Sequence, residues 1–232
     1  MLAVCVATPW AGTATANDDV ELFNGRDLSG WTFFLEETGF NAGGNGKISD
    51  FATVTSDRTI RIAPRMHGAL MTERDFLNYD LHVEFRWADP HPRDDSGLFL
   101  RIRPPFVWDM IHGEQARFYM VQLQPSSTGD LWVMGYNESL LTTSPETSFK
   151  PFGNLELGRG GHIRRHLKLK DAEKPAGEWN SVDVHLKDKT VEVRVNGVLV
   201  NRADRLVDLP GRIGLESERG AIEYRNIRLR PL

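Results

Sequence analysis

Short segments in which apolar and polar residues alternate run through most of the chain. The clearest extends from Tyr79 to Trp87, where every second residue is apolar and the residues between them are charged or histidine. Residues 181–186 and 189–195 repeat this pattern. Successive side chains of a β-strand point to opposite faces, so each segment is predicted to be a strand with one buried and one polar face.

Turn residues separate these predicted strands. Asn196-Gly197 stands between Val195 and Val198, and both turn residues tolerate the positive φ angles that a type I′ hairpin requires. A shift in the alternation at Asn226 predicts a β-bulge in the last strand. No segment keeps a helical period beyond one or two turns. About a dozen short strands with turns between them predict an all-β sandwich of two stacked antiparallel sheets.

Composition narrows the class further. The 232 residues include 28 Lys and Arg against 32 Asp and Glu, a net charge of -4 without a basic block, which argues against nucleic acid as a partner. One cysteine allows neither a disulfide framework nor a cysteine-based metal site. No composition break divides residues 17–232, which we interpret as a single domain. No apolar run outside the first sixteen residues approaches membrane-spanning length.

The first sixteen residues resemble the end of a signal peptide. They are apolar and rich in small residues, and they finish with Ala14-Thr15-Ala16 before the acidic start Asn17-Asp18-Asp19. An Ala-x-Ala sequence in this position is typical of a cleavage site, although the positively charged segment that should precede it is missing. We therefore expect a truncated leader over residues 1–16 and a mature protein that is secreted or periplasmic.

Candidate chemistry lies on the polar faces of the predicted strands, because the usual metal, nucleophile and nucleotide motifs are missing from the sequence. If one sheet curves, its outer face forms a groove, and polar side chains at every second position of such a face suit a sugar. The alternative is a solvated strand face with cross-strand ion pairs. Four rows offer this pattern: Asp94, Asp95 and Ser96 with Arg101 and Arg103; Tyr119, Gln122 and Gln124; Glu216 and Glu218; and Glu223 and Arg225.

Histidines provide a second set of candidates. His112 lies beside Asp109 and Glu114 in an irregular insertion, which makes it the best placed histidine for proton transfer or metal binding. The other histidines are interpreted as solvated or surface residues: His82 and His185 on polar strand faces, and a basic surface patch of His162, Arg164, Arg165 and His166.

Several motifs, in one order, resemble the 3-keto-disaccharide hydrolase domain family, formerly a domain of unknown function. Residues 22–31 read Leu-Phe-Asn-Gly-Arg-Asp-Leu-Ser-Gly-Trp, and residues 96–101 read Ser-Gly-Leu-Phe-Leu-Arg. The family's order then continues with Gly-Glu-Trp-Asn at 177–180, Asn-Gly at 196–197, Gly-Arg-Ile-Gly-Leu-Glu-Ser-Glu at 211–218 and Ile-Glu-Tyr-Arg-Asn-Ile at 222–227. The resemblance covers about residues 19–232.

The resemblance implies a concanavalin A-like jelly-roll sandwich, secreted by bacteria, that acts on glycosides whose C3 hydroxyl is oxidised to a ketone. It also implies a glutamate at position 120, where this chain has Met120, and a glutamine and a His-Gly pair where it has Glu216, Glu218 and Arg219. The expected partner is an oxidised saccharide or glycoside. No cofactor is indicated, and a divalent metal and the oligomeric state are left open.

The chemistry implied for a 3-keto-glycoside starts at C2, whose proton the C3 ketone acidifies. A base removes this proton, the enolate expels the C1 substituent, and water adds back. Glu216 or Glu218 is the expected base and Arg101 or Arg225 the group that holds the enolate, with His112 as a further catalytic candidate. Substrate contacts are expected from Gln122, Gln124, Tyr119, Trp108, Asp95, Glu223 and Arg225.

Strand phase predicts how these residues meet. Glu216 and Glu218 share a face, as do Glu223 and Arg225, so all four form one cluster if the last two strands pair, and Arg101 could join it. Two carboxyls in a partly buried groove raise the pKa of one, which suits a general acid, while a nearby arginine keeps the other ionised. The alternative function is a non-catalytic carbohydrate-binding module of the same fold.

Overall fold

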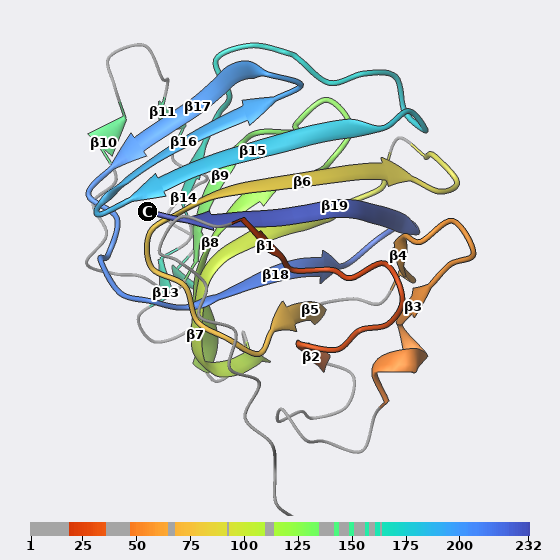
Figure 1. Ribbon diagram of the computed structural model, residues 1–232. Helices are drawn as coiled ribbons and strands as arrows, with labels where there is room; N and C mark the ends of the chain where they lie inside the picture. The colour runs from red at the N-terminus through yellow and green to blue at the C-terminus, as the bar shows by residue number, and fades with distance from the viewer. Residues whose placement is uncertain are drawn as a thin grey trace, which may run out of the picture.

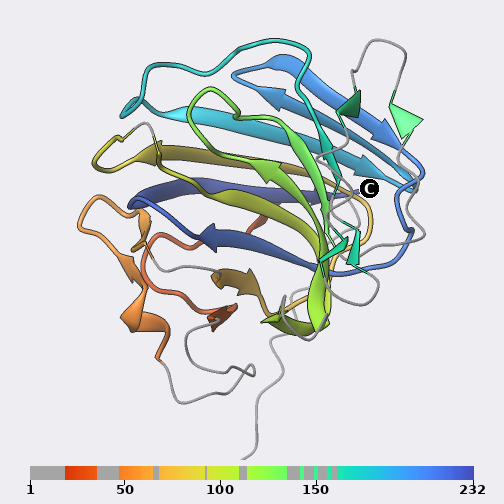
Figure 2. The same ribbon diagram turned by 180° about the vertical axis from the view of Figure 1, so that it is seen from behind.

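The structure, a computed structural model, consists of two antiparallel β-sheets stacked face to face (Figures 1 and 2). It describes residues 19–35, 47–64, 68–91, 93–109, 114–134, 142–143, 149–150, 156–157, 161–162 and 164–232. We call the sheet nearer the viewer in Figure 1 the front sheet and the other the back sheet. The predicted all-β sandwich is confirmed: within the described residues, the one helical element is the 3-10 turn η2 (Ile48–Asp50).

Nine described strands form the front sheet, in the order β10-β17-β16-β15-β6-β19-β4-β3, with β1 also paired to β19. Their bounds are β1 Val20–Glu21, β3 Ala52–Val54, β4 Ile60–Ile62, β6 Tyr79–Trp87, β10 Thr142–Thr143, β15 Asn180–Lys187, β16 Thr190–Val195, β17 Val198–Asp204 and β19 Ile222–Pro231.

Eight described strands form the back sheet, in the order β11-β14-β9-β8-β7-β18-β5-β2. Their bounds are β2 Trp31–Leu35, β5 Gly68–Thr72, β7 Gly97–Asp109, β8 Glu114–Gln122, β9 Leu131–Met134, β11 Phe149–Lys150, β14 Arg164–His166 and β18 Arg212–Ser217. A separate pair is made by β12 (Glu156–Leu157) and β13 (Gly161–His162).

The alternating apolar residues fill the space between the sheets. In β6, Leu81, Val83 and Phe85 are buried, whereas the charged residues between them are partly exposed. From the back sheet, Ile213 and Leu215 of β18 join the same core. Burying each such side chain stabilises the fold by roughly 1.5–3 kcal/mol, so the phase of the alternation decides which face of each strand turns inward.

The back sheet carries a second apolar cluster on its outer face. In β8, Tyr119 and Val121 belong to the core between the sheets, whereas Phe118 and Met120 belong to this second cluster. Its buried members are Phe34, Ala69, Met71, Phe99, Ile102, Phe118, Met120 and Met134. The outer face of the back sheet therefore differs from an ordinary solvated strand face.

Both local features predicted around the last strands are confirmed. At the turn between β16 and β17, Asn196 and Gly197 have φ angles of 50° and 78°, as a type I′ turn requires. The Asn196 side-chain oxygen also accepts a hydrogen bond from the Ser181 backbone N–H at 3.0 Å. In β19 the register shifts between Arg225 and Arg228, and Asn226 has a φ of 50°. This irregularity is the expected bulge.

The conditional prediction that the last two strands pair is wrong. β18 lies between β7 and β5 in the back sheet, whereas β19 lies beside β6 in the front sheet. The chain crosses from one layer to the other between them, through Gly220 at a φ of 74°. Alternation specifies which face of a strand is buried but not which sheet the strand joins, so the two rows of charged residues end up in different sheets.

Candidate active site

Glu216 lies on the outer face of the back sheet, because its neighbour Leu215 belongs to the core between the sheets. The residue is only 3% exposed, and its Oε2 atom has no hydrogen-bond partner among the described residues. A buried polar group without a partner is costly, and native structures keep few of them. Glu216 therefore marks a place where the partner is expected to come from a ligand.

Gly97 of β7 makes room for this carboxyl. A Cβ atom built on Gly97 would lie 2.8 Å from Glu216 Oε2 and closer still to Met120 Sδ, so the two side chains meet over the glycine. Glu216 arrives from β18 on one side and Met120 from β8 on the other. The thioether of Met120 thus covers the carboxyl with apolar atoms and excludes water from it.

Asp95 supplies a second acid beside the start of β7. Its carboxylate accepts hydrogen bonds from the side-chain amides of Gln122, at Oδ1, and Gln124, at Oδ2 and 3.0 Å. Its backbone pairs with that of Arg219 in a two-residue bridge, with both N–H···O distances at 3.0 Å. Next to it, Ser96 Oγ donates to the Glu216 carbonyl oxygen at 2.9 Å. These bonds fix two loops against each other and bring Asp95 to Glu216 of β18 and to Glu218, which follows that strand.

The pKa values of all three carboxyls are raised, with burial as the largest cause in each case. Burial, with smaller contributions from the charges of Glu218 and Asp95, raises the pKa of Glu216 well above 4.5. Burial and the charge of Asp95 raise the pKa of Glu218 to about 7, although Arg219 opposes the change. Burial also raises the pKa of Asp95. The cluster therefore combines Glu216, in which burial favours the protonated form, with a Glu218 that readily gains or loses a proton near neutral pH.

A wall of polar and aromatic side chains continues the same face. Arg165 of β14 donates from Nε to Asp130 Oδ2 at 2.7 Å, and its Nη2 lies 2.5 Å from the same oxygen. Its guanidinium carbon lies 5.0 Å from the ring centre of Trp132 on β9. The interpretation of His162, Arg164, Arg165 and His166 as a basic surface patch is wrong for the last two residues. His166 is fully buried, and Arg165 is paired with Asp130.

The sequence matches the profile of the 3-keto-alpha-glucoside-1,2-lyase-like domain over residues 18–230. The chain belongs to this family. It is therefore a carbohydrate-active domain of the glycosyl hydrolase type, which confirms the resemblance stated on the sequence motifs. Comparison with curated proteins gives no match.

Solved structures agree with the family on the fold. A Parabacteroides distasonis protein described as a glycosyl hydrolase superposes with a TM-score of 0.62 at 17% identity, covering 92% of this chain and 94% of its own. The β-glucanase of Bacillus licheniformis superposes with a TM-score of 0.56 at 13% identity, and the match covers 94% of this chain and 99% of the glucanase. The carbohydrate-binding module CBM66 of Bacillus subtilis superposes with a TM-score of 0.52 at 12% identity, and the match covers 86% of this chain and 94% of the module. The predicted jelly-roll sandwich is thus confirmed.

The family's expected glutamate at position 120 has a counterpart in the structure. Met120 and Glu216 lean over Gly97 from opposite sides, so a carboxyl can reach the same spot from either strand. In this chain the carboxyl comes from β18 rather than from β8.

Arg101 does not reach the cluster. The side chain is fully buried and donates to the backbone carbonyls of Leu77, Val207 and Asp188 at 2.9, 2.7 and 2.9 Å. The register of β7 against β8 shifts just after Leu100, and Arg101 has a φ of 52°, so it leaves the alternation of the strand. The prediction that it holds an enolate is corrected: Arg101 ties three loops together.

Tyr119 also points away from the cluster. It is buried in the core between the sheets, and its hydroxyl accepts a hydrogen bond from the Val207 backbone N–H at 2.7 Å. Gln122 stands an odd number of residues further along the same strand, so the two side chains point to opposite faces. The amides of Gln122 and Gln124 reach the site as predicted for substrate contacts, whereas Tyr119 does not.

Glu223 and Arg225 lie on the outer face of the front sheet, with other partners. Glu223 binds Arg61 at 3.2 Å and Arg86 at 2.8 Å, and Arg225 Nε donates to Glu84 at 2.7 Å. Glu223 and Arg225 thus form cross-strand ion pairs, which was the alternative to a sugar-binding role for these two residues. Two further candidates are not placed by the structure: the side chain of Trp108 is not described, and His112 lies outside the described residues.

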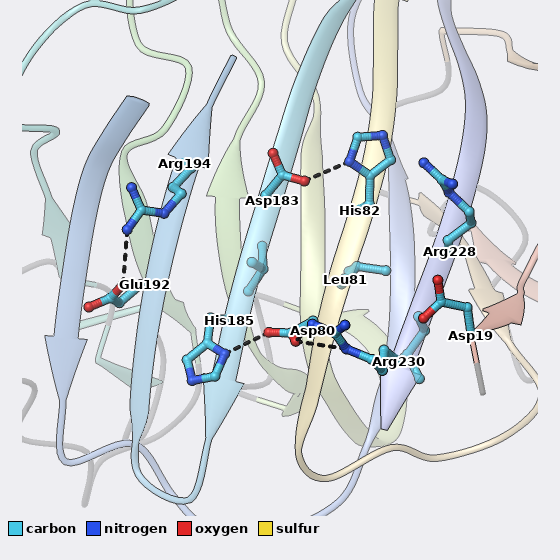
Figure 3. Close-up of a pocket in the computed structure, with 12 residues that line it drawn as sticks. Asp19, Asp80, Leu81, His82, Asp183, His185, Glu192, Arg194, Arg228 and Arg230 are labelled. Carbon is cyan, nitrogen blue, oxygen red and sulfur yellow. Dashed lines mark hydrogen bonds and ion pairs between the residues drawn. The ribbon is translucent and has the colours of Figure 1, made fainter. Parts of the chain in front are cut away.

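The front sheet carries a pocket of about 400 Å³ that competes with this site (Figure 3). His82 and His185 approach Asp183 and Asp80 to 2.6 Å each, and Arg230 also binds Asp80 at 2.6 Å. Both histidines, which were expected to be solvated, are thus hydrogen-bonded to carboxylates, and His185 remains exposed. Asp80 and Asp183 are already paired here, so we place the candidate active site on the back sheet, where the buried Glu216 Oε2 atom has no partner among the described residues.

No group of three or more His, Cys, Asp or Glu side chains among the described residues is arranged to hold a metal ion. No helix in this part of the chain is long and apolar enough to cross a membrane.

Proposed function

We propose that this domain cleaves glycosides whose C3 hydroxyl has been oxidised to a ketone, by elimination across C1 and C2 followed by addition of water. The observation that supports this most is the cluster of Glu216, Glu218 and Asp95, in which the charges of Glu218 and Asp95 act on Glu216 and that of Asp95 acts on Glu218. Burial raises the pKa of Glu216 and so favours its protonated form, and the pKa of Glu218 is raised to about 7. One site therefore offers a proton donor and a proton acceptor at neutral pH.

The residues divide the reaction between them. Glu218 in its ionised form removes the proton from C2, which the neighbouring ketone has acidified. The C1–O bond breaks, and the departing oxygen takes the proton of Glu216. Glu216, now ionised, then takes a proton from water as the hydroxyl adds to C1, and Glu218 returns its proton to C2, so both glutamates regain their starting states.

Charge on the enolate oxygen needs a cation or a strong donor. Arg219 is the described cation nearest Glu218, with its Nε 3.7 Å from Glu218 Oε1. We assign it the role first expected of Arg101 or Arg225. The amides of Gln122 and Gln124 lie beside Asp95 and supply hydrogen bonds to sugar hydroxyls.

The test is release of 4-nitrophenol from its chemically oxidised 3-keto-glucoside. The proposal expects release well above the enzyme-free rate, and none from the unoxidised glucoside, whose C2 proton is not acidic. Equal release from both glucosides would identify an ordinary glycosidase instead.

The alternative, a non-catalytic carbohydrate-binding module, is favoured by the similar fold of CBM66. It predicts saturable binding of a sugar without release of the aglycone. Calorimetry on the same two glucosides separates these outcomes from absence of binding.

A further inference from the structure

The outer face of the front sheet carries two aspartate–histidine pairs that mirror each other. Asp80 and His82 of β6 have the same spacing as Asp183 and His185 of β15, and the two strands run antiparallel. The register sets each histidine opposite the aspartate of the other strand, with the histidine Nδ1 atom 2.6 Å from the aspartate Oδ1 atom. Both pairs line the pocket of Figure 3, so their carboxylates and rings are held in place around it.

Arg228 borders the same pocket with its donors unused. It lies opposite His82 in the register of β19 against β6, and its exposed side chain makes no hydrogen bond or ion pair with the described residues. By contrast, Arg230, two residues further along β19, is held by Asp80 with an Nη2–Oδ2 distance of 2.6 Å. A guanidinium donates five N–H groups and accepts nothing, so Arg228 can bind a carboxylate through two parallel hydrogen bonds.

The acids of the pocket call for hydroxyl groups. Within the described structure Asp19 makes no hydrogen bond or ion pair, and only the Oδ1 atom of Asp183 is bonded. Glu192 lies no closer than 3.5 Å to Arg194 and 3.9 Å to Arg202. An ionised carboxylate accepts hydrogen bonds and donates none. A ligand in this pocket must therefore bring donors, and hydroxyl groups supply them without adding charge.

Charge decides the other group of the ligand. Among the described residues, four acids, three arginines and two histidines line the pocket. Three of the acids already lie against an arginine or a histidine, which leaves the charges of Asp19 and Arg228 unmet. A multiply charged anion such as phosphate is repelled by the four acids, and an amine is repelled by Arg228. A single carboxylate on a hydroxylated ring satisfies both ends of the pocket.

His82 adds a second positive charge beside Arg228 when it gains a proton. Its ring faces Asp183 on β15, Glu84 on its own strand and Arg228 on β19. The hydrogen bond to Asp183 raises the pKa of His82, against burial and the charge of Arg228. The ring is charged below that pKa, whereas a ligand carboxylate with a pKa of about 4 stays ionised. Binding of a carboxylate should therefore tighten as pH falls from 8 to 5.5.

We propose that the pocket of the front sheet binds a uronate, with its carboxylate on Arg228 and its hydroxyl groups on Asp19 and Asp183. The volume of about 400 Å³ lies within the range of about 300–1,000 Å³ that is usual for small-molecule sites. The site belongs to the other layer of the sandwich from Glu216 and takes no part in bond cleavage. It is a second binding site, and it does not depend on the function proposed above.

The test is calorimetry with three sugars that share a ring and differ in charge: D-glucuronate, D-glucose and D-glucosamine. At pH 5.5, glucuronate is expected to bind at least about tenfold more tightly than the other two. Equal affinity for all three, or tighter binding of glucosamine, overturns the inference. Methyl β-D-glucuronide distinguishes two sources of the ligand: affinity equal to that of glucuronate supports the end of an acidic polysaccharide, and weaker binding supports free uronic acid.

Variants locate the site. Arg228→Gln should weaken glucuronate binding about tenfold or more and leave the melting temperature unchanged, because the side chain is exposed and unpaired. Arg61→Gln is the matched control, since Arg61 lies on the outer face of the same sheet but binds Glu223 away from the pocket, and it should keep the affinity. Unchanged affinity in Arg228→Gln overturns the inference.

The pH dependence is the second readout. The wild-type protein should bind glucuronate about three- to tenfold more tightly at pH 5.5 than at pH 8, and His82→Gln should lose most of this difference. An affinity that does not rise on acidification overturns the pairing of the carboxylate with Arg228 beside His82.

These results are separable from the proposed function, because none of them requires release of an aglycone. A protein that binds glucuronate at Arg228 but cleaves no 3-keto-glucoside retains the second site and loses the proposed function. Cleavage of the 3-keto-glucoside without binding of glucuronate gives the opposite result.

Discussion

The outer faces of the two sheets carry similar rows of acidic residues, but the pKa values of these acids are lowered on the front sheet and raised on the back sheet. Both present charged residues at every second position of neighbouring strands. On the front sheet, partial burial alone would raise the pKa of Asp80 and Glu84. Hydrogen bonds and nearby charges outweigh it, from Arg230 and His185 at Asp80 and from Asn226 and Arg225 at Glu84, and the pKa of both carboxyls is lowered. On the back sheet, burial and the charges of neighbouring carboxylates raise the pKa values of Glu216 and Glu218.

The difference comes from the neighbours rather than from the acids themselves. A front-sheet carboxylate is paired, partly solvated and ionised, which stabilises the fold slightly and leaves nothing to react. A back-sheet carboxyl is buried next to Met120 and other acids, which destabilises its ionised form and keeps a proton available. Four predictions test this contrast.

The largest effect is expected from Glu216→Gln. Removal of the proton donor should lower the rate of aglycone release about 100- to 10,000-fold, while the melting temperature stays the same or rises. The matched control is Glu223→Gln on the front sheet, which should keep the rate within about twofold and lower the free energy of unfolding by about 1–2 kcal/mol. The contrast breaks if both variants lose stability and neither loses activity.

Gly97→Ala should have the next largest effect. The added methyl group meets Met120 Sδ and Glu216 Oε2, so at least one of these side chains must move. We expect about a tenfold loss of rate and a loss of about 1–3 kcal/mol in the free energy of unfolding. The double variant Gly97→Ala with Met120→Ala should recover part of both. No recovery would place the strain elsewhere.

The pH dependence of stability should distinguish the two faces. Between pH 4.5 and about 7, Glu218 holds its proton in the folded protein but loses it in the unfolded chain, so its contribution to stability falls as pH rises. Asp80 and Glu84 behave oppositely, and their contribution is lost as pH falls toward and below 4. Glu218→Gln should therefore raise the melting temperature more at pH 8 than at pH 5. An equal change at both pH values would contradict the raised pKa.

The smallest effect is expected from His185→Gln on the front sheet. The side chain is 46% exposed, and exposed ion pairs contribute about 0–1 kcal/mol. Chemical denaturation should show a loss of less than about 1 kcal/mol, with aglycone release unchanged. A large loss of activity in this variant would move the active site to the pocket of the front sheet.

Alternation in the sequence was sufficient for the strands, the Asn196-Gly197 turn and the two-layer fold, because burial of one strand face is a local property. It also placed Glu216 and Glu218 on one face. It could not show that β18 and β19 join different sheets, since this depends on pairing between distant segments. The bulge that turns Arg101 into the interior is likewise invisible in the alternation, whereas the phase error at Tyr119 could have been avoided by counting residues.

The wall at Arg165 was missed for another reason. β14 is three residues long and wholly basic, so it has no alternation from which a buried face could be predicted. One indication was available: Trp132 stands between Leu131 and Val133, so an aromatic ring occupies the outward position of a strand whose neighbours are buried. A large aromatic residue on an outward position indicates a binding surface or a covered one.

The hydrogen bonds of Ser96 have a consequence for how the protein folds. Ser96 Oγ donates to the carbonyl of Glu216, 120 positions along the chain, and shares a second bond with Tyr224, 128 positions away. Contacts of such long range form slowly, because a large loop must close before they stabilise anything. The acids therefore meet only after β18 has inserted between β7 and β5. A chain whose last strands have not yet been synthesised therefore lacks the repulsion between the clustered acids. Activity is expected only after the whole fold has formed.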